Sequence, residues 1–117
     1  MTEASHAVPD TEEFPFRGSI VWLTPEQGGR ATGPPLPRQQ WPYYAATAYV
    51  PPHTAATGLA SFVLRDFQPG AWRSQAQGRW LVVGNEGDQA VQQGSVVVIT
   101  EGARDVAFFI IEQKTRR

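Results

Sequence analysis

Short apolar runs recur along this chain, and glycine or proline ends nearly every one of them. In residues 58–66, Ala60, Phe62 and Leu64 share one face, which is typical of a half-buried strand. The pattern predicts six strands, at residues 17–23, 43–50, 58–66, 79–83, 95–100 and 104–111. No segment free of proline and glycine keeps a helical apolar repeat, so we expect no helix. The sequence therefore predicts an all-β protein, either a small closed barrel or a sandwich.

The last two predicted strands form a hairpin around residues 101–103 that is apolar on both faces. Val96 and Val98 lie on one face, and Val97 and Ile99 lie on the other. One face fills the barrel, whereas the other needs a loop, a second chain or a partner to cover it. We expect a partner surface here, and its candidate residues are Phe108, Phe109 and Trp72.

A long loop follows the first predicted strand. Pro25 ends the strand, and Gly28 and Gly29 allow a sharp turn that presents Arg30. The simplest interpretation is a turn with an incidental arginine; the functional one is a ligand loop. Residues 33–37 then favour an extended, polyproline-like path. A loop of this length is often functional, and the alternative is an insertion that covers one end of the barrel.

The chain of 117 residues has room for one domain. We expect a mobile acidic tail over residues 1–14, a single barrel over 15–112 and a frayed tail over 113–117. The first tail holds four of the eleven acidic residues and no basic one, so the rest carries ten basic and seven acidic residues, about +3. A bias this small neither demands nor excludes an RNA partner.

Several kinds of chemistry find no support in the sequence. The absence of cysteine excludes disulfides, thiolate nucleophiles and cysteine-based zinc sites. His6 and His53 are the only histidines, and neither stands in a catalytic arrangement or in metal-ligand spacing. No apolar run approaches the roughly 18 residues of a membrane span, and the N-terminus lacks a signal-peptide pattern. We therefore expect a cytoplasmic, non-catalytic protein without metal or cofactor.

Binding has more support than catalysis. Arginine offers a planar fork for phosphate or carboxylate, and the chain carries Arg30, Arg38, Arg65, Arg73, Arg79 and Arg104. Exposed aromatic side chains stack on bases, and the candidates are Trp41, Tyr43, Tyr44 and Trp72. The alternative is that such aromatics fill the barrel, which we favour for Trp22 and Trp80 because both lie within predicted strands.

Three segments carry a resemblance to a known family: residues 20–30 with their Gly-Gly-Arg turn, the Ala-Ala-Thr-Gly step at 55–58, and residues 90–106 with their Glu-Gly-Ala-Arg turn. Over about residues 16–112 the chain resembles the third domain of elongation factor Tu, a six-stranded antiparallel Greek-key barrel. In that family the domain packs against other domains and touches the T stem of aminoacyl-tRNA. The resemblance implies a binding surface at Gly28, Gly29, Arg30, Thr57, Glu101, Gly102 and Arg104.

The chain departs from the family at several contact positions, where Ala31, Tyr43, Gly87 and Thr100 stand in place of polar or basic residues. It also has no GTPase domain and no second barrel, so no GTP binding is expected. Our first hypothesis is a protein-interaction module, which includes self-association. The second is binding of tRNA or another structured RNA through Arg30 and Arg104, and the third is a small-molecule site between the proline-rich loop and Trp72.

Overall fold

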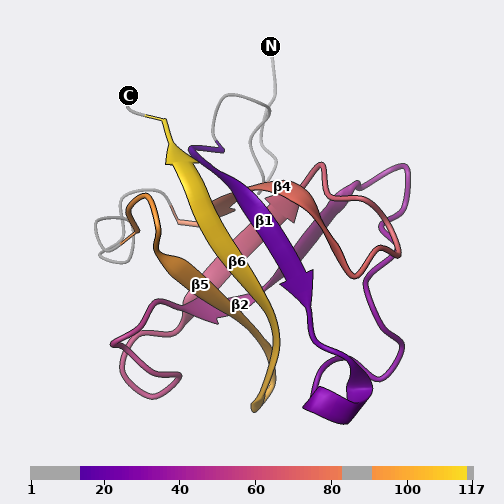
Figure 1. The fold of residues 1–117 in the computed structure, drawn as a ribbon, viewed down its shortest axis with the longest axis horizontal. Coiled ribbons are helices and arrows are strands. Elements are labelled where there is room, and N and C mark those ends of the chain that lie inside the picture. Colours follow the sequence, from indigo (N-terminus) through magenta and orange to yellow (C-terminus); the bar gives the residue numbers. More distant parts are fainter. Residues whose placement is uncertain (1–13, 83–90, 116–117) are drawn as a thin grey trace.

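Six antiparallel strands close into a barrel in the computed structural model, which describes residues 14–82 and 91–115 (Figure 1). The strands are β1 (Phe16–Trp22), β2 (Tyr43–Tyr49), β3 (Ala60–Arg65), β4 (Arg73–Trp80), β5 (Val96–Glu101) and β6 (Arg104–Lys114). Their order around the barrel is β1-β4-β3-β2-β5-β6. Since β2, β3 and β4 follow one another and β1 lies beside β4, the connectivity is a Greek key. The predicted all-β, six-stranded antiparallel barrel is confirmed.

Apolar side chains fill the interior from every strand. The core includes Phe16, Ile20, Trp22, Ala48, Phe62, Leu64, Trp80, Val97, Ile99, Ala107, Phe109 and Ile111. Aromatic rings meet at its centre, where the ring of Phe62 lies 4.9 Å from that of Trp80 and 6.0 Å from that of Phe109. The prediction that Trp22 and Trp80 fill the barrel is confirmed, since each is only 3% exposed.

Strand β4 begins six residues earlier than the sequence predicts. The prediction placed a connection over residues 67–78 and a strand over 79–83, whereas β4 spans Arg73–Trp80. Its inward positions include Ala76 and Gly78, which are small because neighbouring aromatics take the space. A methyl group at Gly78 would lie 2.6 Å from the Phe62 ring and 2.7 Å from the Phe109 ring. A strand that faces the core with small residues shows no apolar alternation, so the pattern missed it.

The ends of the barrel segment also differ from the prediction. Phe14, at the border between the expected tail and the barrel, is 7% exposed and stacks on Tyr43 with the ring centroids 6.1 Å apart. Gln113 was expected in a frayed tail, but β6 continues to Lys114, and the amide of Thr115 donates to the Pro15 carbonyl at 2.7 Å. The expectations for residues 1–13, for 116–117 and for the turn at 84–87 lie outside the described residues.

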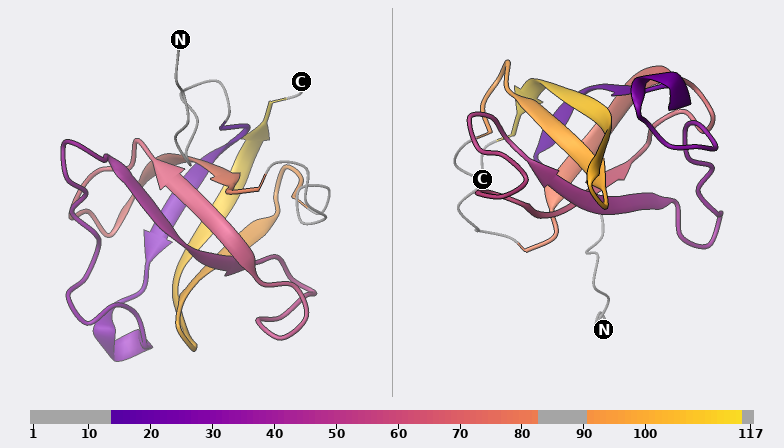
Figure 2. Two further views of the ribbon diagram at one scale, coloured as in Figure 1. Left: turned by 180° about the vertical axis from the view of Figure 1, so that it is seen from behind. Right: turned by 90° about the horizontal axis from the view of Figure 1, so that it is seen from below.

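Three connections gather at one end of the barrel (Figures 1 and 2). They are the start of the β1–β2 loop with its 3-10 turn Pro25–Gln27, the β2–β3 loop, and the two-residue β5–β6 turn at Gly102 and Ala103. The predicted hairpin around residues 101–103 is confirmed. This end therefore holds most of the residues that the sequence singled out for binding.

Candidate functional site

Arg30 and Glu101 come together at this end of the barrel. The Arg30 Nε donates to Glu101 Oε2 at 2.8 Å, and Arg30 Nη1 donates to the Gly33 carbonyl. Side-chain exposure is 23% for Arg30 and 38% for Glu101, so the pair is partly shielded from water. Arg104 adds a second link, because its Nη1 donates to the Gly29 carbonyl at 3.3 Å. The two glycine-arginine motifs from opposite ends of the chain thus fasten the first loop to the last hairpin.

Local chemistry explains why the first loop reaches this position. Thr24 and Gln27 form a capping box: Thr24 Oγ1 accepts from the Gln27 amide, and Gln27 Oε1 accepts from the Thr24 amide. Gly28 then takes a left-handed φ of 93°. Gly29 is required for another reason, since a methyl group there would lie 2.2 Å from the Leu23 carbonyl oxygen. The glycine pair therefore turns the chain back against the end of β1.

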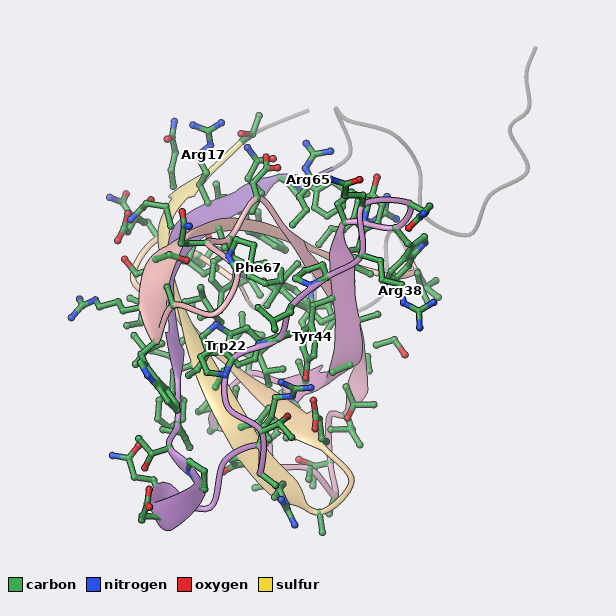
Figure 3. The ribbon with its side chains drawn as sticks, turned by 90° about the vertical axis from the view of Figure 1, so that its right-hand side faces the viewer. Arg17, Trp22, Arg38, Tyr44, Arg65 and Phe67 are labelled. Atoms are coloured by element: carbon green, nitrogen blue, oxygen red, sulfur yellow. The ribbon has the colours of Figure 1, made fainter. Side chains whose placement is uncertain are left out.

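Tyr44 is the third member of the cluster, and the sequence offered it only as a stacking residue. Its hydroxyl donates to Glu101 Oε2, and its ring lies under the Arg30 guanidinium at 5.8 Å from the centroid. Burial raises the pKa of Tyr44; the hydrogen bond and the charge of Glu101 raise it further, while Arg30 lowers it. The ring meets Trp22 edge-on at 5.1 Å, and Figure 3 shows both beside Phe67 under the long loop. Tyr44 therefore ties the ion pair to the core.

The charge at this end does not favour an anionic ligand. Glu26, Glu101 and Asp105 oppose Arg30 and Arg104, so two basic and three acidic residues leave a formal charge of −1. Phosphate binding depends on cations that are not already neutralised. The arrangement of Arg30 and Glu101 is that of a structural ion pair.

Thr57 does not join this cluster. It lies in the β2–β3 loop, where its hydroxyl accepts from the Thr54 amide at 2.9 Å and lies 3.4 Å from His53 Nδ1. Gly102 is exposed in the β5–β6 turn with φ of 61°. The structure thus brings Gly28, Gly29, Arg30, Glu101, Gly102 and Arg104 to one place and leaves Thr57 in its own loop.

Most of the other arginines and aromatics serve the fold. The Arg65 guanidinium lies 4.0 Å from the centroid of the Phe14 ring and donates twice to Gln77 Oε1. Arg79 is only 3% exposed and donates to the carbonyls of Trp80 and Leu81. Among the candidates for base stacking, Trp41 and Trp72 are exposed, at 46% and 45%.

A second feature is an apolar outer face on the hairpin and its neighbour. We call Val21, Val96, Val98, Phe108 and Ile110 the outer strip. Their neighbours along each strand belong to the core, so these five side chains point away from it. Phe108 pairs with Val21 on β1 and with Val98 on β5, and Ile110 pairs with Val96. The strip thus crosses β5, β6 and β1, which lie side by side on the near face in Figure 1.

Two of the three residues predicted for the partner surface lie elsewhere. The prediction that Phe109 lies on the surface is wrong, since this side chain is fully buried. Adjacent residues of a strand point to opposite faces, and Phe108 occupies the outer face. Trp72 is exposed, but it precedes β4, where its carbonyl accepts from the Trp22 amide at 2.8 Å. A methyl group at Gly33 would lie 3.4 Å from its indole ring. Trp72 thus borders the proline-rich loop rather than the outer strip.

Charged side chains stand at both ends of the outer strip, Arg17 with Glu112 at one end and Asp105 with Arg104 at the other. Arg17 is exposed near the start of β1, opposite Gln113 of β6, and Figure 3 shows it at the far end from the hairpin turn. Asp105 is exposed near the start of β6, where it accepts from the Tyr49 hydroxyl at 3.2 and 3.3 Å. Burial raises the pKa of Tyr49, and the charge of Asp105 and the hydrogen bond to it raise the pKa further. Neither Arg17 nor Asp105 stood out as a binding residue in the sequence. The strand register shows that each lies about four residues from the middle of the strip along β6.

Comparison with protein-family models, curated proteins and solved structures finds no match to this chain. The closed six-stranded barrel is shown by the structure, and the resemblance to the third domain of elongation factor Tu stays a prediction. Within residues 14–82 and 91–115, no group of three or more His, Asp or Glu side chains is arranged to hold a metal ion. In the same ranges, no helix is long and apolar enough to cross a membrane.

Proposed function

We propose that this protein is a non-catalytic binding module that associates with a second copy of itself through the outer strip. The observation that carries the proposal is the position of Val21, Phe108 and Ile110, with Val96 and Val98, outside a closed barrel. The barrel already has its core inside, so these side chains leave water fully only when another surface covers them.

The positions of Arg17 and Asp105 favour a second copy as that surface. A two-fold axis through the strip between Phe108 and Ile110 exchanges its two ends. Arg17 of one copy then faces Asp105 of the other, and the reverse contact follows by symmetry. The strand register supports this match. Arg17 lies beside Gln113, four positions after Phe109, and Asp105 lies four positions before Phe109. Both charges are therefore about equally far from the axis along β6.

The strip is small, which sets the strength of the contact. Four of its members are half-buried by their neighbours, and Val98 is only 5% exposed. Stable dimers bury about 800 Å² on each partner, and smaller contacts are transient. We therefore expect a reversible dimer with a Kd of about 10 µM or weaker.

Sedimentation velocity over a wide concentration range tests the proposal. The wild-type chain should move from monomer to dimer as its concentration rises. The Ile110→Lys variant should remain monomeric, because a charge on the strip stays in water only when the strip is uncovered. Leu59→Lys is the matched control, since Leu59 is 43% exposed in another part of the molecule. A wild-type monomer at about 1 mM, where a transient contact of this size would form, rejects the proposal.

Binding of structured RNA through Arg30 and Arg104 is the second candidate function. It rests on the resemblance and on the position of both arginines at one end of the barrel. Arg104 is the better probe, because it is exposed whereas Arg30 is paired with Glu101. If this surface binds tRNA, Arg104→Ala should weaken binding and lower the salt dependence of log K by about 0.9. An unchanged electrophoretic shift rejects this candidate.

A small-molecule site beside the proline-rich loop is the third candidate. The loop packs on Trp72 at Gly33, and Gly70 donates to the Pro35 carbonyl at 3.3 Å. A ligand that binds there should change the indole fluorescence of Trp72, and the change should disappear in Trp72→Phe.

A further inference from the structure

We propose that residues 34–37, Pro-Pro-Leu-Pro, form a docking segment for a partner protein with an aromatic-lined groove that binds polyproline helices. The segment lies in the β1–β2 loop, away from the outer strip, and it is independent of the self-association proposed above. Four observations carry the proposal: the composition of the segment, its fixation, the face that it buries and the face that it exposes.

Composition favours a polyproline helix. Pro34, Pro35 and Pro37 have their φ fixed near that of the polyproline conformation. Pro34 and Leu36 each precede a proline, which disfavours the α region and leaves extended backbone. None of these residues belongs to a helix or a strand. The run thus meets the steric conditions for the ligand conformation that such grooves select.

Two hydrogen bonds hold the segment in place. Before it, the Gly33 carbonyl accepts from Arg30 Nη1, and Gly33 turns the chain with φ of 83°. Within it, the Pro35 carbonyl accepts from the Gly70 amide at 3.3 Å. A segment fixed in this way loses less conformational entropy on binding than a free peptide does.

Burial separates the segment into two faces. A polyproline helix has three residues per turn and therefore three edges, of which a groove contacts two. Pro35 is buried against the barrel, while Pro34 and Pro37 are half-buried and Leu36 is 75% exposed. In that geometry, Pro34 and Pro37 would share one edge and Leu36 would lie on the next. The two edges that a groove would contact are thus the two that the barrel leaves accessible.

A loop that only covered the end of the barrel would expose its prolines and bury its leucine. The structure has the reverse arrangement at Pro35 and Leu36. Among the residues that the structure describes, the exposed large hydrophobic side chains are Leu36, Trp41, Leu59, Trp72 and Val82, and Leu36 is the most exposed of them. Arg38 follows directly and is exposed, so an acidic residue at the rim of the groove could pair with it. These features specify a proline-binding domain with an acidic rim.

A binding assay with purified proline-binding domains tests the proposal. The probe is a panel of SH3, WW and EVH1 domains, titrated with the full-length chain by fluorescence polarisation. At least one domain should bind. For that domain, Leu36→Ala and Pro37→Ala should each weaken binding by about tenfold or more, as expected for contact residues at the centre of an interface. Leu59→Ala is the matched control and should bind like the wild type, since Leu59 is also exposed but lies outside the segment.

Two further measurements keep the result interpretable. Thermal unfolding of each variant shows whether the barrel is intact, and Leu36→Ala should unfold like the wild type because its side chain is exposed. A synthetic peptide of residues 33–40 should compete for the domain, and the same peptide with Leu36→Ala should not. Absence of binding by every domain of the panel up to about 1 mM, or binding that folded Leu36→Ala leaves unchanged, overturns the proposal. Neither result bears on self-association, which Leu36→Ala should leave intact.

Discussion

The Arg30 guanidinium and the Glu101 carboxylate meet at 2.8 Å although 71 positions separate them in the sequence. The contact fastens the long β1–β2 loop to the β5–β6 hairpin, and the hydroxyl of Tyr44 completes it from β2. Exposed ion pairs contribute a median of about 0–1 kcal/mol to stability, and we place this partly shielded, hydrogen-bonded pair at the upper end of that range. We therefore infer that the main role of Arg30 is to stabilise the fold rather than to bind a ligand.

A double-mutant cycle at this pair should measure its contribution. Arg30→Ala, Glu101→Ala and the double variant should give a coupling free energy of about 1 kcal/mol in denaturant unfolding. Both side chains retain some exposure, which keeps this value modest. Additive effects of the two single substitutions would show that the pair does not stabilise the barrel.

Tyr44 should make stability fall at high pH. Burial, together with Glu101, raises the pKa of Tyr44 above its ordinary value of 10.0, against the opposing effect of Arg30. The folded protein therefore holds this proton more tightly than the unfolded chain, so its contribution is complete below pH 10 and is lost as the pH rises beyond that value.

Comparison with Tyr44→Phe isolates this effect. Denaturant unfolding from about pH 9 to 11.5 should show a steeper loss of stability in the wild type than in the variant. Tyr43→Phe serves as the control because Tyr43 is also half-buried but makes no hydrogen bond to Glu101. Parallel curves for the wild type and Tyr44→Phe would contradict the prediction.

Phe108 and Phe109 are adjacent in β6, and their substitution should have very different effects. Phe109 is fully buried, so Phe109→Ala should lower the free energy of unfolding by about 3–5 kcal/mol. Phe108 is half-buried on the outer strip, so Phe108→Ala should lower it by only about 1 kcal/mol and weaken self-association. Equal losses of stability would mean that both side chains pack inside.

Gly18 should tolerate no side chain. A methyl group there would lie 1.9 Å from the Ile110 carbonyl oxygen, which belongs to the backbone and cannot turn away. Gly18→Ala should therefore separate β1 from β6 and destabilise the barrel by about 3 kcal/mol. Gly94→Ala is the control. Gly94 has φ of 91° but open space around it, so this substitution should lower the free energy of unfolding by only about 1 kcal/mol. Thermal unfolding compares the two variants.

Local patterns predicted five of the strands: alternation around Phe62 and Leu64 predicted β3, aromatic content predicted β2, and apolar runs predicted the last hairpin. It failed at β4, where Ala76 and Gly78 must be small to admit aromatic rings from other strands. No local pattern reports such a requirement, since it depends on residues far away in the sequence.

The candidate site could be predicted only in part, because its contacts also depend on residues that are far apart in the sequence. The matching Gly-Gly-Arg and Glu-Gly-Ala-Arg turns drew attention to Arg30 and Glu101 at opposite ends of the chain, and the barrel brings them together. Their role as a pair needed the third partner, Tyr44, whose hydroxyl reaches Glu101 from β2. Likewise, the charges at the ends of the outer strip appear only once the register of β1 and β6 is known.

A charge-swap experiment tests self-association through the outer strip most directly. Arg17→Asp and Asp105→Arg each place like charges opposite one another in the proposed two-fold dimer, so each variant alone should stay monomeric. An equimolar mixture should dimerise, because both contacts between an Arg17→Asp copy and an Asp105→Arg copy then join opposite charges. Sedimentation velocity measures all three samples. A heterodimer in the mixture alone is the predicted result, and a mixture that associates no more than its separate components would contradict it.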